Sequence, residues 1–266
     1  MSTWALVPAR SFATAKSRMA HLGAGRPALA RALLDHVLSV LGRAGLDGVL
    51  VATDGEDVAA MAREHGAEVL FDATSMVAGV PVPLAVVVDR GLAALEGRGA
   101  DAALVLMADL PLLAPADVRR MIGALPGADV VAAPDRDHLG TNALALRLPA
   151  ALPTCFGNAD SYQRHLVAAA ARAMRVVTID RDTLGFDLDG PVDLADLLAT
   201  HATEPEARIG GEGAVGAEAV VGVLDAIERI VHAAGRLTGL GLHHAQHAVQ
   251  RRTLRRHPPR AARNAS

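Results

Sequence analysis

Aromatic side chains and cysteine are scarce in this 266-residue sequence. One tryptophan, one tyrosine and four phenylalanines are too few for the stacking platforms that bind single-stranded nucleic acids, so we expect no nucleic-acid partner. The single cysteine, Cys155, excludes an intramolecular disulfide and is typical of a reducing cytoplasm. We expect Cys155 to be a loop residue and not a nucleophile.

Long hydrophobic runs and a strong net charge are also missing. The apolar stretches are much shorter than the roughly 20 residues that a membrane-spanning helix needs. The first residues lack the basic region and apolar run of a signal peptide. A formal net charge of −3 gives no general attraction to polyanions. We therefore expect a cytoplasmic protein without a membrane partner.

Lysine occurs only once, at position 16, although the chain has 26 basic residues of the lysine and arginine types. Lysine is a compact point charge on a flexible stem, whereas arginine is a broad planar fork. A narrow loop that must reach one phosphate group can therefore require a lysine. The alternative is that one lysine falls by chance in a solvated loop.

Short apolar strands alternate with amphipathic helices over residues 1–202. This alternation predicts parallel strand pairing and a three-layer α/β domain. Two strand patterns that follow each other directly, 128–134 and 142–148, predict that the sheet is mixed. The expected strands are 4–8, 48–53, 67–71, 101–110, 128–134, 142–148, 175–179 and 185–189, and the expected helices are 28–42, 55–66, 83–97, 114–125, 161–173 and 191–201.

The character of the sequence changes near residue 202, where we place a domain boundary. Residues 203–266 are interpreted as a Gly- and Glu-containing linker, an amphipathic helix at 217–234 and a basic, disordered tail. An isolated helix of this length is only marginally stable, so we expect its apolar stripe to pack on the first domain or on a second subunit of a homodimer. The stripe consists of Val220, Leu224, Ile227 and Val231.

Charged residues lie at the ends of two predicted strands. Arg10, Lys16 and Arg18 follow the first strand, where open α/β sheets bind anionic ligands. Asp109 lies at the end of the most apolar strand, where an aspartate is costly unless it is paired or binds a cation. The alternatives are a solvated surface loop for the three basic residues and a turn cap for Asp109.

Two further aspartates, Asp187 and Asp189, are two positions apart in an expected strand. Side chains at this spacing project from the same face of an extended chain. Their like charges repel unless a cation neutralises them. Carboxylate oxygens suit Mg²⁺, which usually takes one or two carboxylates together with substrate phosphate oxygens. The alternative is a pair of exposed loop aspartates.

Five segments together resemble one enzyme family. The segments "VPARSFATAKSRMA", "VLMADLPLL", "APDRDHLGTNALALR", "FGNADSYQRHL" and "FDLDGPVDLADL" are similar, in order and spacing, to the CofC-type guanylyltransferases of coenzyme F-420 biosynthesis. The resemblance covers residues 4 to about 200. It implies a nucleotide-diphospho-sugar-transferase-like, Rossmann-like fold for residues 1–202. It also implies an enzyme that joins GTP to phosphoenolpyruvate, 3-phospho-D-glycerate or 2-phospho-L-lactate and releases pyrophosphate.

The resemblance implies three groups of site residues. The nucleotide-binding group is Pro8, Arg10, Lys16 and Arg18, with Lys16 on the triphosphate. The ligands of two Mg²⁺ ions are Asp109, Asp187 and Asp189. The acceptor-binding group is Thr141, Gly157 and Ser161. Lys16 and Asp109 are also the expected catalytic residues.

The sequence departs from the family pattern at three places. Ala85 stands where an asparagine is usual, His138 and Leu139 replace a Gly-Thr pair, and one extra residue separates Gly157 from Ser161. Two alternative functions stay open. One is a related nucleotidyltransferase with a molybdopterin or sugar-phosphate acceptor, although such enzymes typically have a glycine-rich loop that "AKSR" replaces here. The other is a non-catalytic nucleotide-binding scaffold, against which the three aspartates argue.

Overall fold

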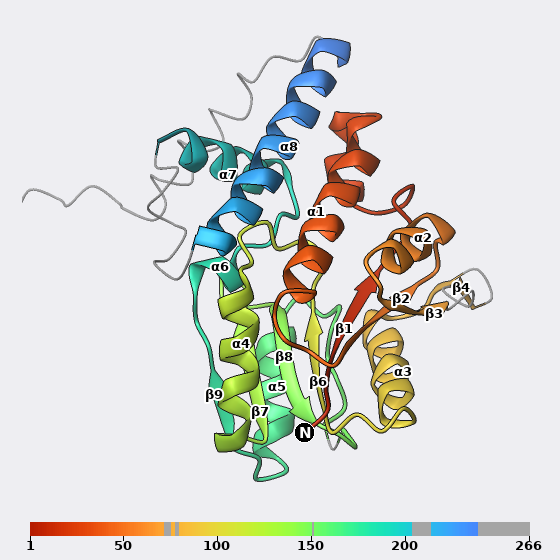
Figure 1. Cartoon of the computed structure of the whole chain (residues 1–266), viewed down its shortest axis with the longest axis vertical. Coiled ribbons are helices and arrows are strands. Elements are labelled where there is room, and N and C mark those ends of the chain that lie inside the picture. The colour runs from red at the N-terminus through yellow and green to blue at the C-terminus, as the bar shows by residue number, and fades with distance from the viewer. Residues whose placement is uncertain (72–75, 78–79, 151, 204–213, 239–266) are drawn as a thin grey trace, which may run out of the picture.

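A seven-stranded mixed sheet forms the centre of the molecule, in the strand order β3-β2-β1-β6-β8-β7-β9 (Figure 1). The computed structural model describes residues 1–71, 76–77, 80–150, 152–203 and 214–238. Strand β8 is antiparallel to both of its neighbours, and the other pairs are parallel, which confirms the predicted mixed sheet. The strands are β1 (Thr3–Ala9), β2 (Gly48–Thr53), β3 (Glu68–Phe71), β6 (Ala102–Leu106), β7 (Val130–Pro134), β8 (Thr141–Arg147) and β9 (Val176–Thr178).

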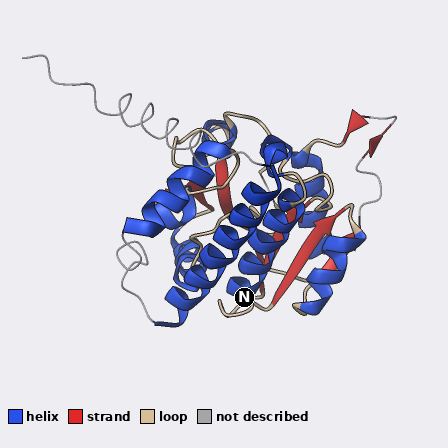
Figure 2. Cartoon of the chain, turned by 90° about the horizontal axis from the view of Figure 1, so that it is seen from above, coloured by secondary structure: helices blue, strands red, loops and turns tan. Residues whose placement is uncertain are grey.

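Helices cover both faces of this sheet, and a small hairpin projects from one side of the molecule (Figure 2). The hairpin consists of β4 (Met76–Val77) and β5 (Val80–Pro81). The helices are α1 (Gly25–Leu41), α2 (Glu56–Glu64), α3 (Leu84–Glu96), α4 (Pro115–Ala124), α5 (Ser161–Ala170), α6 (Asp182–Gly185), α7 (Pro191–Thr203) and α8 (Ala214–Thr238), with short 3-10 turns η1 (Ser17–Leu22) and η2 (Leu125–Gly127).

The residues of β1 show how the sheet separates two cores. Ala5 and Val7 are buried in a cluster that also contains residues of α1, α2 and α4. Leu6, which points to the opposite face, is buried with residues of α3 and α5. Because successive strand side chains alternate between the two faces, one apolar strand serves both cores. The predicted three-layer α/β domain is therefore confirmed.

A third cluster lies on the outer side of α1, between η1, α7 and α8. Helix α8 runs alongside α1 (Figure 1). The predicted stripe on α8 packs on the same chain, with three of its residues fully buried and Val231 partly buried. The buried members from η1, α1 and α8 are Met19, Leu22, Leu29, Leu33, Val220, Val223, Leu224 and Ile227.

Helix α7 is described as far as Thr203, next to the domain boundary expected near residue 202, which stays a prediction. The third cluster continues across this boundary, because it includes Leu194 and Leu197 of α7 as well as residues of α8. The expected linker lies mostly outside the described residues, and the expected basic tail lies entirely outside them. No helix in the described part of the chain has the length and apolar character needed to cross a bilayer.

The strand expected at 185–189 is wrong. Gly185 ends helix α6, and residues 186–189 belong to no strand. Phe186 and Leu188 are buried in the third cluster, so their alternating pattern reflects packing between loops and helices. The segment is tied to the sheet edge by the Leu188 N–H, which donates to the Asp109 carbonyl at 3.0 Å.

Candidate active site

The loops that follow β1 and β6 meet at one edge of the sheet. These strands are parallel neighbours, so both of their carboxyl ends lie at this edge. Strand β6 is fully buried and ends at Leu106, three residues before Asp109. The loop after β1 continues through Lys16 into η1. The order of the strands therefore places the lone lysine beside the first predicted aspartate.

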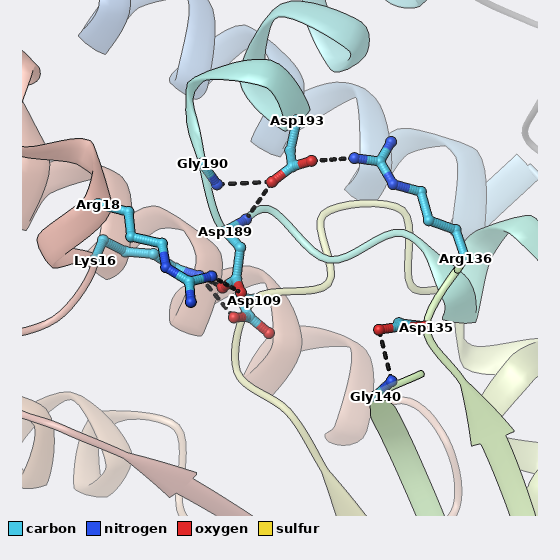
Figure 3. A network of polar contacts seen from close by, with 9 residues as sticks. All are labelled: Lys16, Arg18, Asp109, Asp135, Arg136, Gly140, Asp189, Gly190 and Asp193. Carbon is cyan, nitrogen blue, oxygen red and sulfur yellow. Dashed lines mark hydrogen bonds and ion pairs between the residues drawn. The ribbon is translucent and has the colours of Figure 1, made fainter. Parts of the chain in front are cut away.

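The Lys16 ammonium lies between two carboxylates, as Figure 3 shows. Its Nζ atom is 2.6 Å from Asp109 Oδ2 and 3.3 Å from Asp189 Oδ1, and the side chain is only 10% exposed. Arg18 Nη1 lies 3.2 Å from the other oxygen of Asp189, but its side chain is 76% exposed. Burial acts to lower the pKa of Lys16, but Asp109 and Asp189 outweigh it and raise that pKa. Lys16 is therefore a fully charged, desolvated cation at neutral pH.

The backbone at Lys16 is strained, with φ 53° and ψ 44° in the left-handed region. This conformation costs a non-glycine residue about 1–2 kcal/mol. Arg26 of α1 stabilises the loop, because its guanidinium donates to the carbonyls of Ala13 (2.5 Å) and Ala15. The strained backbone and the hydrogen bonds from Arg26 together indicate that the loop is shaped to position the Lys16 ammonium group.

The start of the same loop is fixed by acidic residues on and before α2. Asp54 accepts a hydrogen bond from the Ser11 N–H at 2.9 Å. Asp57 accepts one from the Phe12 N–H at 2.9 Å and a second from the Ser11 hydroxyl at 3.2 Å. The sequence interpretation missed Arg26, Asp54 and Asp57, because each acts on backbone groups that only the fold identifies.

Asp187 is the third carboxylate of the cluster. Burial, together with the negative charges of Asp109 and Asp189, raises its pKa to about 6. Asn142 on β8 donates a side-chain hydrogen bond that partly offsets this rise. A carboxyl group with a raised pKa beside two other carboxylates is a position where a cation would be stabilising.

The donor chemistry of the three aspartates fits Mg²⁺. Among the described residues, no three acidic, histidine or cysteine side chains are arranged so that they alone could hold a metal ion, and the Lys16 ammonium separates Asp109 from Asp189. Mg²⁺ seldom relies on an all-protein cage and commonly binds one or two carboxylates together with substrate phosphates. The residues therefore fit a metal that binds along with a nucleotide.

A second ion-pair network supports the loop that carries Asp189 (Figure 3). Asp193 accepts hydrogen bonds from the N–H groups of Asp189 (3.0 Å) and Gly190 (2.7 Å). Arg136 pairs with Asp193 and with Asp196 (3.2 Å), and its guanidinium lies 4.8 Å from the centre of the Phe186 ring. This network fixes the backbone of the aspartate loop without contributing to the cluster itself.

Pro8 and Arg10, which precede Lys16 in β1 and the loop after it, differ in solvent exposure. Pro8 is buried within β1, beside Ala52 of β2. Arg10 directly follows β1 and is exposed, and no described carboxylate pairs with it. The structure therefore brings Lys16 and Arg18 to the carboxylates and leaves Arg10 facing solvent at the same edge.

The predicted acceptor residues fall into a buried pair and one exposed glycine. Ser161 Oγ donates to Thr141 Oγ1 at 3.3 Å, and His165 Nδ1 lies 3.0 Å from the same oxygen. Thr141 begins β8, directly before the Asn142 that contacts Asp187, so the pair lies at the same sheet edge as the carboxylates. His165 was missed by the sequence interpretation, although it lies one helical turn after Ser161 on α5.

Gly157 lies against the start of α3. Its φ is +87°, and a Cβ atom there would come within 3.1 Å of the Leu84 Cβ, so only glycine fits without strain. Nearby, the Thr154 hydroxyl donates to Asp89 (2.7 Å) and lies 3.3 Å from the carbonyl of Ala85. The loop before α5 is thus attached to α3, in the region where Ala85 departs from the family pattern.

His138, a second departure, adopts φ 56° in the left-handed region. The resemblance described above leads us to expect glycine at this position, and glycine adopts such a φ at little cost. His138 Nε2 lies 3.0 Å from Asp180 Oδ2, and the imidazole packs edge-on against Tyr162. His138 therefore adopts a turn conformation that glycine favours, and it contacts Tyr162 of α5 and Asp180 in the loop after β9.

Comparisons with known proteins find one matching family and several similar sequences. The sequence model of the family described as "Guanylyl transferase CofC like" matches residues 3–208. A phosphoenolpyruvate guanylyltransferase from Rubrobacter xylanophilus is 40% identical over 211 residues, covering 78% of this chain and 99% of that protein. Another from Sphaerobacter thermophilus is 38% identical over 205 residues, covering 76% of this chain and 95% of that protein.

A solved structure supports the fold independently of close sequence similarity. A crystal structure assigned as a nucleotide-diphospho-sugar transferase, from Desulfovibrio desulfuricans G20, aligns with a TM-score of 0.65. The alignment covers 88% of this chain and 98% of that chain at 14% identity. At this identity the similarity shows the fold alone, which is the fold class that the sequence predicted.

Proposed function

Because this chain belongs to the CofC-like guanylyltransferase family, we propose that it transfers the guanylyl group of GTP to a phosphorylated three-carbon acid in the biosynthesis of coenzyme F-420. Phosphoenolpyruvate is the first acceptor to test, because both relatives above are named for it. The other acids of this class are 3-phospho-D-glycerate and 2-phospho-L-lactate. The reducing compartment inferred from the lone cysteine supports a cytoplasmic enzyme.

The observation that carries the proposal is the convergence of Lys16, Asp109, Asp187 and Asp189 at the edge formed by β1 and β6. Guanylyl transfer joins an oxygen of the acceptor phosphate to the α-phosphorus of GTP and breaks the bond to the β-phosphate oxygen. The acceptor phosphate is already an anion at neutral pH, so no general base is required. The main obstacle is the repulsion between two polyanions, which cations at this edge reduce.

Lys16 is the principal nucleotide-binding residue in this proposal. Its ammonium is already desolvated, and its strained loop places it at the sheet edge where phosphates bind. In the nucleotide-free protein the carboxylates of Asp109 and Asp189 neutralise it. An entering triphosphate offers the same ammonium an alternative anionic partner. Arg10 and Arg18, both largely solvent-exposed, supply further positive charge, and Pro8 shapes the start of the loop.

Asp109, Asp187 and Asp189 would hold Mg²⁺, with Asp109 also facing the Lys16 ammonium. Bound Mg²⁺ supplies positive charge that neutralises the triphosphate and the departing pyrophosphate. The protein's own contribution is to keep three carboxylates in place through Leu188, Asn142 and Asp193, which bond to the backbone or side chains of this cluster. Ser161 and Thr141 bind the acceptor acid, with Gly157 allowing close approach in the loop before α5.

The experiment that tests this function identifies the joined product. GTP labelled in its α-phosphate is incubated with the protein, Mg²⁺ and each acid, and the product is analysed by mass spectrometry. We expect a product that contains guanosine, both phosphates of the new anhydride and the acid. Labelled ATP and CTP serve as controls. Products from a sugar phosphate or molybdopterin, with none from the three acids, would contradict the proposal.

A further inference from the structure

A buried cluster of uncharged polar groups lies where α5 meets the start of β8. Thr141, Ser161 and His165 are only 5%, 3% and 1% exposed. Polar groups this deeply buried are mostly hydrogen-bonded to other protein atoms. The direction of each bond in the cluster can therefore be deduced from its fixed donors.

The backbone N–H of Cys155 determines which nitrogen of the His165 ring carries the proton. The Cys155 N–H donates to His165 Nε2 at 2.8 Å, and a backbone N–H can only be a donor. Nε2 is therefore the unprotonated nitrogen. Burial lowers the pKa of His165 to about 4, so the ring is neutral at pH 7 and carries its single proton on Nδ1. The ring stacks edge-on against Phe156, which fixes its plane.

The Nδ1–H faces Thr141 Oγ1 at 3.0 Å, so Thr141 accepts this hydrogen bond. Ser161 Oγ donates to the same oxygen at 3.3 Å. A hydroxyl oxygen has two lone pairs, and both are now used. Among the described residues, His165 and Ser161 are the only hydrogen-bond partners of Thr141 Oγ1. The Thr141 proton therefore points away from both and is available to a ligand.

A hydroxyl in this state recognises an atom that only accepts hydrogen bonds. Phosphate and carboxylate oxygens are of this kind, whereas a substrate hydroxyl could bind in either direction. Ser161 is also the first residue of α5, and the amino end of a helix favours negative charge. Both features select an anionic oxygen at this position.

We propose that His165 is a positioning residue that fixes the Thr141 hydroxyl as a donor to an anionic oxygen of the acceptor acid. The inference rests on the proposed function, since it assumes that Thr141 binds the acceptor. His165 itself does not touch the substrate. It replaces a freely rotating hydroxyl with one whose orientation is set before the acid binds, at a position that carries no positive charge.

Two nearly isosteric variants each retain one of the two hydrogen bonds that the His165 imidazole makes. His165→Asn can place an amide N–H near the Nδ1 position and retains a donor to Thr141. His165→Gln can place an amide oxygen near the Nε2 position and retains an acceptor for Cys155. We expect His165→Gln to raise KM for the acceptor acid about tenfold, with KM for GTP unchanged, and His165→Asn to stay within about threefold of the wild type.

A double-mutant cycle tests whether the effect passes through Thr141. In a Thr141→Val background, His165→Gln should raise the acceptor KM no further. Equal effects of the Asn and Gln variants, a parallel rise in KM for GTP, or an undiminished effect in the Val background would each overturn the assignment. If the wild-type protein transfers guanylate to none of the three acids, the proposed function fails whatever His165 does.

The tautomer of His165 can also be measured directly in the wild-type protein, so this test does not depend on whether a variant folds. Long-range ¹H–¹⁵N correlation in protein labelled at histidine distinguishes the two neutral imidazole tautomers. We expect His165 to carry its proton on Nδ1 at pH 7. A proton on Nε2, or a doubly protonated ring, would overturn the inference, because Thr141 would then be free to rotate or the Cys155 N–H would be displaced.

Discussion

The two sides of the site use opposite electrostatic designs. The nucleotide side contains four charged groups, Lys16, Asp109, Asp187 and Asp189, whose exposure rises to 47% at Asp189. On the acceptor side, the neutral side chains of Thr141, Ser161 and His165 are at most 5% exposed. Charges near solvent can exchange one partner for another when substrates bind, whereas buried hydroxyls keep one direction. The comparison shows how one sheet edge can receive two polyanions and still distinguish them.

The largest expected effect comes from removing one charge on the nucleotide side. Asp109→Asn eliminates a carboxylate that contacts Lys16 at 2.6 Å and is expected to bind Mg²⁺. We expect kcat to fall by about 10²–10³-fold or more, the scale of losing one preorganised electrostatic contact in an active site. Steady-state pyrophosphate release measures the effect, and thermal unfolding checks the fold.

A matched control for this variant is Glu68→Gln. Glu68 forms an ion pair with Arg98 at 2.8 Å on the edge strand, away from the carboxylate cluster, with 51% of its side chain exposed. Its kcat should equal that of the wild type. Wild-type turnover by Asp109→Asn would contradict the assignment of Asp109 as a metal ligand. It would also contradict the claim that the nucleotide side acts through its charged groups.

A smaller effect is expected when the charge is kept and its shape is changed. Lys16→Arg places a planar fork where a point charge lies between two carboxylates in a side-chain site that is 10% exposed. We expect kcat/KM for GTP to fall about 10²-fold, with KM for the acceptor little changed. Arg63→Lys, in an exposed ion pair with Glu56, is the control. Full kcat/KM in Lys16→Arg would show that the lone lysine is an accident of composition.

The two sides should also give opposite pH dependences of stability. Asp187 has a folded pKa of about 6, above the ordinary aspartate pKa of 3.8, so the folded protein binds the extra proton between these values. Its contribution to the free energy of unfolding therefore decreases as pH rises from 4 to 6. His165 has a folded pKa of about 4, below the ordinary histidine pKa of 6.5, so its contribution to the free energy of unfolding increases as pH rises from 4 to 6.5.

Variants at these two residues should change the slope in opposite directions. Between pH 4 and 6, the stability of Asp187→Asn should rise more steeply with pH than that of the wild type, and that of His165→Asn less steeply. Each change is at most about 3 kcal/mol over the window, at about 1.4 kcal/mol per pKa unit. Urea unfolding at several pH values measures the slopes. Parallel slopes in both variants would show that the two sides do not differ in this way.

The smallest effect on turnover is expected outside the family-matched residues. Ile227 of α8 is fully buried in the third cluster, which also contains Met19 and Leu22 of η1, just after Lys16. Ile227→Ala should lower the free energy of unfolding by about 2–4 kcal/mol and reduce kcat/KM for GTP less than about fivefold. Denaturant unfolding and initial rates measure both. Unchanged stability would show that α8 is not part of the folded core in solution.

The nucleotide side was largely predictable from the sequence. Strand periodicity located the end of β1 to within one residue, whereas β6 ends at Leu106 and not at residue 110 as expected. Parallel pairing brings the carboxyl ends of these strands together, so Lys16 and Asp109 could still be expected at one edge. The pattern at 185–189 indicated a strand wrongly, because alternating burial arises equally when Phe186 and Leu188 pack between loops and helices. The two aspartates nevertheless lie near Asp109 and Lys16, and their role as metal ligands stays a prediction.

The acceptor side, and the ion pairs that hold the loop of Asp189, were less predictable from the sequence. His165 meets Thr141 only because α5 lies across the start of β8, and its second bond goes to a backbone amide that no sequence pattern identifies. Arg136 and Asp193 are 57 positions apart, so their ion pair depends entirely on the fold. One signal was present: His165 follows Ser161 by four residues, the spacing that places two side chains on one face of a helix.

The central claim is that this edge of the sheet joins GTP to a phosphorylated three-carbon acid. The most direct measurement is pyrophosphate release by the wild-type protein with GTP, phosphoenolpyruvate and Mg²⁺, repeated with each component left out. We predict release only when all three are present, and its loss in Asp109→Asn. Release without the acid, equal release with ATP, or no release with any of the three acids would contradict the account.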